Sequence, residues 1–143
     1  MYYKSLSITP KAFDRHWRNQ PTCAAEAAVY LSAYFFHLRA VLDKKRLPAI
    51  IVDRPSGSIL SINLPAFELL AIDAVGLRLL DFSVDQEIHR WIDQQIQTAE
   101  KSRQPVLLHN ADGCRITCKV NAKSAPGYSG WAILGLEVNQ AQP

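Results

Sequence analysis

Apolar residues recur at helical spacing from Ala24 to Leu42, the longest apolar region of the chain. Thr22 is available as an N-cap before this region. After it, the basic residues 44–46 suit a helix C-terminus, and Pro48 prevents the helix from continuing. The pattern predicts one long amphipathic helix.

Two short apolar runs, 49–52 and 59–62, follow on either side of a segment rich in Pro, Ser and Gly, which predicts a β-hairpin. Asn63 can cap a short helix after the second run. Helical periodicity returns after Ser83 and ends before Pro105. Three further strands are expected at 106–109, 114–120 and 131–138. This order can form a single antiparallel sheet with helices packed on one face.

The composition fits one intracellular domain. A chain of 143 residues that is 48% hydrophobic can build one core, and a net charge of +3 demands no nucleic acid. The apolar stretch contains Glu26, His37 and Arg39, and a central charge costs about 3 kcal/mol on membrane insertion, so we expect no membrane span. Three cysteines cannot all pair, and the N-terminus has no signal-peptide pattern, so a cytoplasmic location is expected.

Five segments stand at the joints of this order: Pro48–Asp53, Gly57–Asn63, Ala66 with Leu69, Asp112-Gly113 and Trp131–Asn139. Together they resemble the PAS family over about residues 47–139. One departure is Ala71, which stands where the family often has a glycine after the first short helix. The resemblance implies an α+β PAS fold, in which short helices lie on one face of a five-stranded antiparallel sheet and a long N-terminal amphipathic helix precedes it. It divides the chain into a helical extension (1–46), a PAS domain (47–139) and a polar tail (140–143).

The function that this resemblance implies is that of a signalling sensor module that binds a small apolar ligand, forms a homodimer through its N-terminal helix, or does both. It would relay its state to a separate or fused effector. The alternatives are a ligand-free protein interaction scaffold and a small enzyme. The interface is expected at Leu31, Phe35 and Leu38, because the segment from Leu47 onward has enough elements to close a core without that helix. The candidate pocket residues are Asn63, Phe67, Leu70, Leu80, Phe82, Trp91, Ile116, Cys118, Trp131 and Ile133.

No catalytic residue, metal site or cofactor is expected. Among the histidines, His89 is the one that a haem hypothesis would choose, but it shares a helical stripe with Asp85 and Asp93, which predicts that it faces solvent. Flavin-binding LOV relatives carry a cysteine in a mid-domain helix, whereas the comparable residues 76–80 contain none. Glycine-rich phosphate loops are absent. The purified protein is therefore expected to be colourless.

Overall fold

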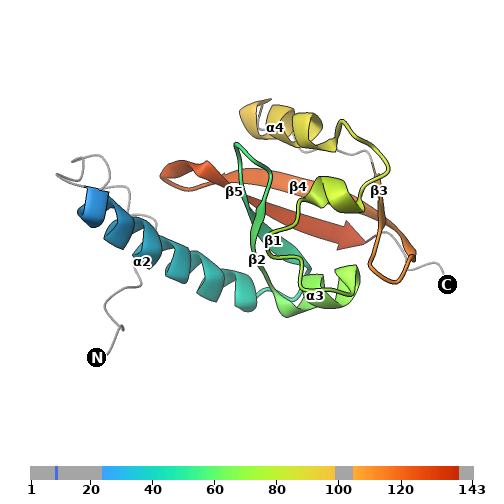
Figure 1. Cartoon of the computed structure of the whole chain (residues 1–143), viewed down its shortest axis with the longest axis horizontal. Helices are drawn as coiled ribbons and strands as arrows, with labels where there is room; N and C mark the ends of the chain where they lie inside the picture. Colours follow the sequence, from blue (N-terminus) through green and yellow to red (C-terminus); the bar gives the residue numbers. More distant parts are fainter. Residues whose placement is uncertain (1–8, 10–23, 99–104, 139–143) are drawn as a thin grey trace.

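The structure, a computed structural model, describes residue 9 and residues 24–98 and 105–138. The predicted tail 140–143 and most of residues 1–23 lie outside the described residues. The elements run in the order that the sequence pattern predicts (Figure 1). They are α2 (Ala24–Asp43), β1 (Ala49–Asp53), β2 (Ile59–Ile62), α3 (Leu64–Leu70), the 3-10 helix η2 (Leu79–Phe82), α4 (Ile88–Thr98), β3 (Val106–His109), β4 (Arg115–Ala125) and β5 (Tyr128–Val138).

The five strands form one antiparallel sheet in the order β2-β1-β5-β4-β3. The strand that comes last in the chain therefore lies in the middle, between β1 and β4. This confirms the predicted five-stranded antiparallel sheet. Strands β1 and β5 are apolar along most of their length, which is typical of strands whose two faces are covered.

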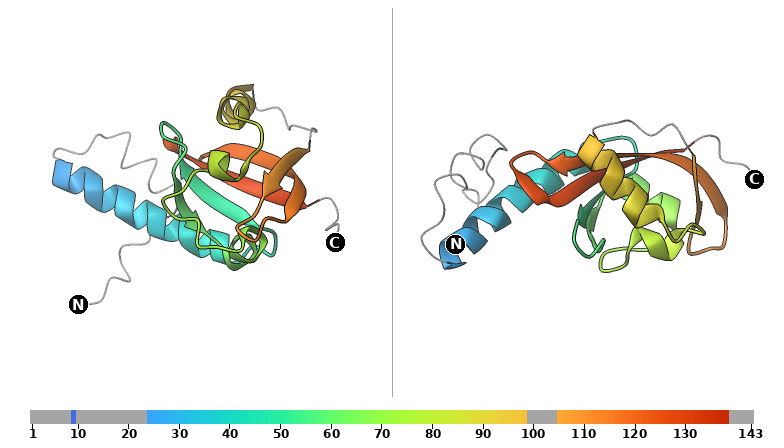
Figure 2. Two further views of the ribbon diagram at one scale, coloured as in Figure 1. Left: turned by 45° about the vertical axis from the view of Figure 1, so that its right-hand side comes forward. Right: turned by 90° about the horizontal axis from the view of Figure 1, so that it is seen from above.

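Helices cover both faces of the sheet. On one face, which we call the inner face, α3, η2 and α4 pack over a large cluster that includes Ile50, Val120 and Leu134. On the other, the outer face, α2 packs over a second cluster that includes Ile51 and Ile133. Figure 2 shows α2 and α4 on opposite sides of the sheet.

The residues predicted to contact a second copy also pack against the chain's own sheet. Leu38 is buried in the outer cluster, and Leu31 and Phe35 are half-buried and pack against it. The expectation that the segment from Leu47 onward closes its core alone does not hold, because the sheet needs cover from α2. Side chains along β5 point in turn to the two faces of the sheet. Ile133 points to the outer face, and without α2 its side chain would be exposed to water.

An aromatic group fixes α2 to the β4–β5 hairpin. The ring of Trp131 lies 6.1 Å from that of Tyr34, 5.4 Å from that of Phe35 and 4.8 Å from that of Tyr128, measured between centroids. The Tyr34 hydroxyl also donates a hydrogen bond to the carbonyl of Pro126, at the hairpin turn. Burial raises the pKa of Tyr34 to about 12, so this phenol stays protonated and can donate at neutral pH.

Helix α3 begins and ends through local features of the sequence. The Asn63 side chain accepts a hydrogen bond of 3.0 Å from the backbone N–H of Ala66, as the sequence predicts for a cap. At the other end, Ala71 has a φ of 61°, in the left-handed region where glycine is preferred. Ala71 therefore adopts, at the C-terminal end of α3, a backbone conformation that glycine enters more easily than any residue with a side chain.

If α2 stabilises the domain through the outer face, shortening Leu38 should be costly. We expect Leu38→Ala to lower the free energy of unfolding by about 2 to 4 kcal/mol, because it removes buried methyl groups and leaves a cavity. The matched control is Val29→Ala on the same helix, where the side chain is 53% exposed and the change should be within about 0.5 kcal/mol. Urea denaturation followed by circular dichroism measures both. Equal losses in the two variants would contradict the packing of α2 on its own sheet.

Candidate ligand cavity

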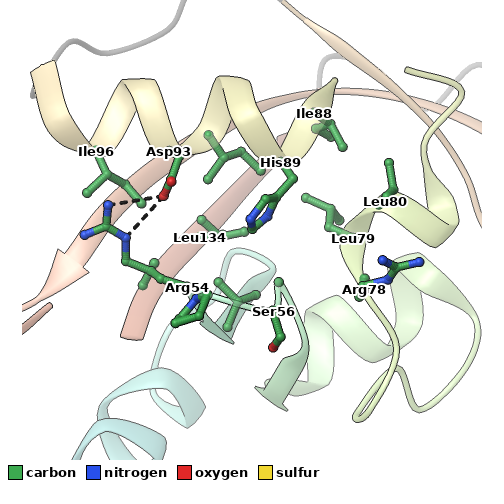
Figure 3. A pocket seen from close by; sticks show the side chains of 15 residues that line it. Arg54, Ser56, Arg78, Leu79, Leu80, Ile88, His89, Asp93, Ile96 and Leu134 are labelled. Atoms are coloured by element: carbon green, nitrogen blue, oxygen red, sulfur yellow. Dashed lines mark hydrogen bonds and ion pairs between the residues drawn. The ribbon is translucent and has the colours of Figure 1, made fainter. Parts of the chain in front are cut away.

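A cavity with a volume of about 270 Å³ lies between the inner face of the sheet and the two helical elements η2 and α4 (Figure 3). Strands β1 and β5 form its floor, and α4 closes it from above. Helix α4 turns one side toward it because its isoleucines follow helical spacing. The apolar lining consists of Val52, Leu79, Leu80, Ile88, Ile92, Ile96, Ala132 and Leu134.

An ion pair closes one end of the cavity. The Nε and Nη2 atoms of Arg54 lie 3.3 and 3.1 Å from Oδ1 of Asp93 on α4 (Figure 3). Nη1 lies 3.4 Å from the Ser124 hydroxyl oxygen and 3.3 Å from the Ser129 carbonyl oxygen. One guanidinium at the end of β1 therefore connects α4 to the β4–β5 hairpin.

His89 points from α4 into the cavity, above the turn that joins β1 and β2 (Figure 3). Its ring packs directly on Gly57, where a Cβ atom would lie 3.0 Å from Nδ1. Gly57 also has a φ of +76°, so the position favours glycine for two independent reasons. The turn and the histidine thus form one side of the cavity together.

The prediction that His89 faces solvent is wrong. It relied on a helical stripe shared with Asp85 and Asp93, but α4 begins at Ile88, so Asp85 precedes the helix. Asp85 instead lies in a turn that the Ser83 hydroxyl stabilises. Asp93 does share the stripe, yet Arg54 holds it against the protein. A stripe of charged residues therefore marked the rim of the cavity rather than a solvent-exposed side.

No family model and no curated protein matches the chain. Solved structures do match. The LOV protein of Rhodobacter sphaeroides aligns with a TM-score of 0.64 at 13% identity, over 76% of this chain and 68% of that one. A domain of a sensory box sensor histidine kinase/response regulator from Geobacter sulfurreducens aligns with a TM-score of 0.58 at 18% identity, over 75% and 96%.

A third match is the PAS domain, in complex with ethanol, of a LuxR-family transcriptional regulator from Burkholderia thailandensis. It aligns with a TM-score of 0.54 at 12% identity, over 71% of this chain and 96% of that one. The chain has the PAS fold. Identities this low establish the PAS fold and nothing more specific, and this fold is typical of signalling sensor modules.

Only Leu80 of the ten predicted pocket residues lines this PAS cavity. Leu70, Phe82, Ile116 and Cys118 are buried in the inner cluster, and Trp91 is half-buried against it. Phe67, on α3, is 44% exposed. Asn63 is buried but its amide binds backbone groups.

The prediction that Trp131 and Ile133 line the cavity is wrong, because both lie on the other face of the sheet. Both belong to the outer cluster, and their neighbours Ala132 and Leu134 line the cavity. Strand β5 is apolar at nearly every position, so its sequence carries no alternation from which the inner face could be read. In β4, where apolar and polar residues alternate, the assignment of Ile116 and Cys118 to the inner face is correct.

The polar residues of the cavity were missed by the sequence-based prediction. Arg54 and Asp93 are 39 positions apart, and no spacing rule joins them. A weak signal was available for Asp93 and His89, because each directly follows an isoleucine of the buried stripe on α4. Residues beside such a stripe lie at the rim of whatever the helix covers.

The described residues contain no group of three or more side chains that could hold a metal ion. Cys114 is exposed, whereas Cys118 is buried, and burial raises the pKa of the Cys118 thiol to about 11. A thiol held in its protonated form is a poor nucleophile. Within the same residues, no helix is long and apolar enough to cross a membrane.

The geometry of Arg54 predicts a ranked series of stabilities for the PAS domain. We expect Asp93→Asn to lower the free energy of unfolding by about 1 kcal/mol, since it removes one partly exposed ion pair. Arg54→Gln should cost more, because the bonds to Ser124 and Ser129 are lost as well.

The control for this series is Glu87→Gln. It removes the exposed contact of 3.8 Å between Glu87, just before α4, and Arg90 of that helix. Its effect should be within about 0.5 kcal/mol. Chemical denaturation measures all three variants. If Arg54→Gln were no more destabilising than Glu87→Gln, the guanidinium would not hold α4 in place.

Proposed function

We propose that this PAS domain is a sensor module that binds a small ligand in the cavity under α4 and relays its state to a partner protein or a fused effector. The observation that carries the proposal is the position of Arg54. It contacts α4, which closes the cavity, and the β4–β5 hairpin, on which α2 packs. A ligand that moves α4 would therefore act on an element outside the cavity.

The contacts between the cavity and α2 are continuous. Arg54 donates a hydrogen bond to the carbonyl of Ser129, the residue that follows Tyr128 in the hairpin. Tyr128 packs edge-on against Trp131, and Trp131 contacts Phe35 on α2. In this proposal α2 is the output element, because it is the described helix that lies against the sheet on the side away from the cavity.

The comparisons support this proposal at the level of fold. The matched domains include parts of a sensor histidine kinase and of a transcriptional regulator, and one of them was solved with a small organic molecule bound. No catalytic step forms part of the proposal. Two free cysteines among the described residues support a reducing location such as the cytoplasm.

We further propose that a second copy covers the outward side of α2. This side carries Val29 and Phe36, which lie seven positions apart on one stripe of the helix and whose side chains are 53% and 59% exposed. Exposed apolar residues on one helix favour an interaction surface, and symmetric pairs are the commonest oligomers. The interface would then use these positions in place of Leu38, which is buried against the sheet.

The same exposed residues favour a second candidate function, a scaffold that binds proteins without any ligand. The two functions differ in the state of the cavity. A scaffold needs no occupant there, and substitutions that fill the cavity should leave its interactions unchanged. A sensor should lose its ligand when the cavity is filled.

Native mass spectrometry of the purified protein tests whether a small molecule is bound in the cavity. We expect an additional mass on the wild type and its loss in Ala132→Leu, because Ala132 is buried in the floor of the cavity and a larger side chain would occupy the space. Ala111→Leu, at an exposed position in the β3–β4 turn, is the control that should keep the additional mass. A wild type without any bound molecule would favour the scaffold.

Light scattering tests whether two copies of the chain associate through α2. We expect Phe36→Asp to convert a dimer into a monomer with an unchanged circular dichroism spectrum, because the charge would enter an apolar contact between copies. The control is Lys45→Asp, an exposed change just beyond the end of α2 that should leave the dimer intact. A wild type that is monomeric at about 50 µM, where interfaces of modest affinity are occupied, would contradict this part of the proposal.

A further inference from the structure

The chemistry of the cavity lining indicates which kind of ligand it accepts, given the sensor function proposed above. Its charged groups are already neutralised by one another. Arg54 pairs with Asp93, and Arg78 pairs with Asp81 at 3.4 Å. Four hydrogen bonds engage the Arg54 guanidinium, which has five N–H groups.

His89 is the exception among the polar side chains of the lining. The Ser56 hydroxyl donates to Asp53 at 2.6 Å and accepts from the Ser58 backbone N–H at 3.2 Å. The His89 ring has no hydrogen-bond or ion-pair partner within residues 24–98 and 105–138, although it is half-buried and points into the cavity (Figure 3). A polar group in such surroundings is stabilised by a partner, and a ligand can supply one.

The volume limits the size of the ligand. A cavity of about 270 Å³ is slightly smaller than the pockets that hold drug-sized molecules. It corresponds to the liquid volume of about nine water molecules, and therefore to a ligand of about ten non-hydrogen atoms. Most of the walls are aliphatic, so most of these atoms must be apolar.

We infer that the cavity takes a small uncharged organic molecule with an apolar body and a single hydrogen-bonding group, such as a hydroxyl or carbonyl, directed at His89. A carboxylate would have to displace Asp93 from Arg54 or enter the cavity without a counter-ion. Either event costs more than burying a hydroxyl that binds the imidazole. An uncharged hydroxyl or carbonyl meets a ring that can donate or accept.

Three ring compounds of similar size represent the three classes of ligand. Benzyl alcohol is uncharged with one hydroxyl, benzoate carries a carboxylate, and toluene is purely apolar. The measurement is a titration of isotope-labelled wild-type protein by amide chemical shifts, which reports both affinity and location. We expect benzyl alcohol to shift residues around the cavity and to bind about three- to tenfold more tightly than toluene, the range that one hydrogen bond provides. Benzoate should bind most weakly of the three.

His89→Phe and His89→Gln test the role of the imidazole. We expect His89→Phe to remove the preference of the wild type for benzyl alcohol over toluene, with toluene itself bound as before. His89→Gln, which keeps a donor and an acceptor, should retain most of that preference. His109→Leu, a change at the end of β3 away from the cavity lining, should behave as the wild type. The amide spectra show directly whether each variant is folded.

Other outcomes would overturn the inference. Tightest binding of benzoate would contradict an uncharged ligand and leave the sensor proposal standing. Equal weakening of benzyl alcohol and toluene by His89→Phe would mean that the ring acts by shape alone. If none of the three compounds shifted cavity residues at millimolar concentration, the ligand class would be wrong, whereas the co-purification experiment would still decide the sensor proposal independently.

Discussion

The fold depends on one buried amide. The side chain of Asn63 is 1% exposed, and it accepts hydrogen bonds of 3.0 Å from the backbone N–H groups of Ala49 and Ala66. Its amide nitrogen donates to the carbonyls of Leu42 and Leu47 at 3.2 and 2.9 Å. A single side chain thus joins the end of α2, the start of β1 and the start of α3. Because it satisfies four backbone groups at once, its loss would leave several of them buried without partners.

The sequence could predict the order of the elements because that order depends on local signals. The Asn63 cap, the turn at residues 53–58 and the alternation along β4 each act over a few positions, and the structure confirms each of them. The position of α2 could not be predicted in the same way. A helix packs on its own sheet, and not on a second copy, when one face of that sheet is apolar and no other element covers it. An apolar strand with two buried faces does not carry that information.

The candidate site was predicted less well than the fold, and for a related reason. Its polar residues come from the β1–β2 turn, from Arg78 at the start of η2 and from the first half of α4, which only the folded sheet brings together. The carboxylates near His89 in the sequence predict that its side chain faces solvent. A sequence does not show whether a carboxylate is hydrated or paired with an arginine. Because Asp93 pairs with Arg54, it lies at the edge of the cavity and does not mark a solvent-exposed side of α4. Residues at the edge of a buried stripe are therefore the positions where sequence patterns are least informative.

The central place of β5 also has a consequence for the order in which the domain is made. Ribosomes synthesise the N-terminal residues first, yet β1 pairs on one side with β5, which is translated about eighty residues later. Until Val138 has left the ribosome, the β1–β2 hairpin and the β3–β4 hairpin have no strand to join them. Both hairpins expose edges and apolar faces during this interval. The nascent chain therefore has to be protected from aggregation longest at the strands that are most deeply buried in the finished domain.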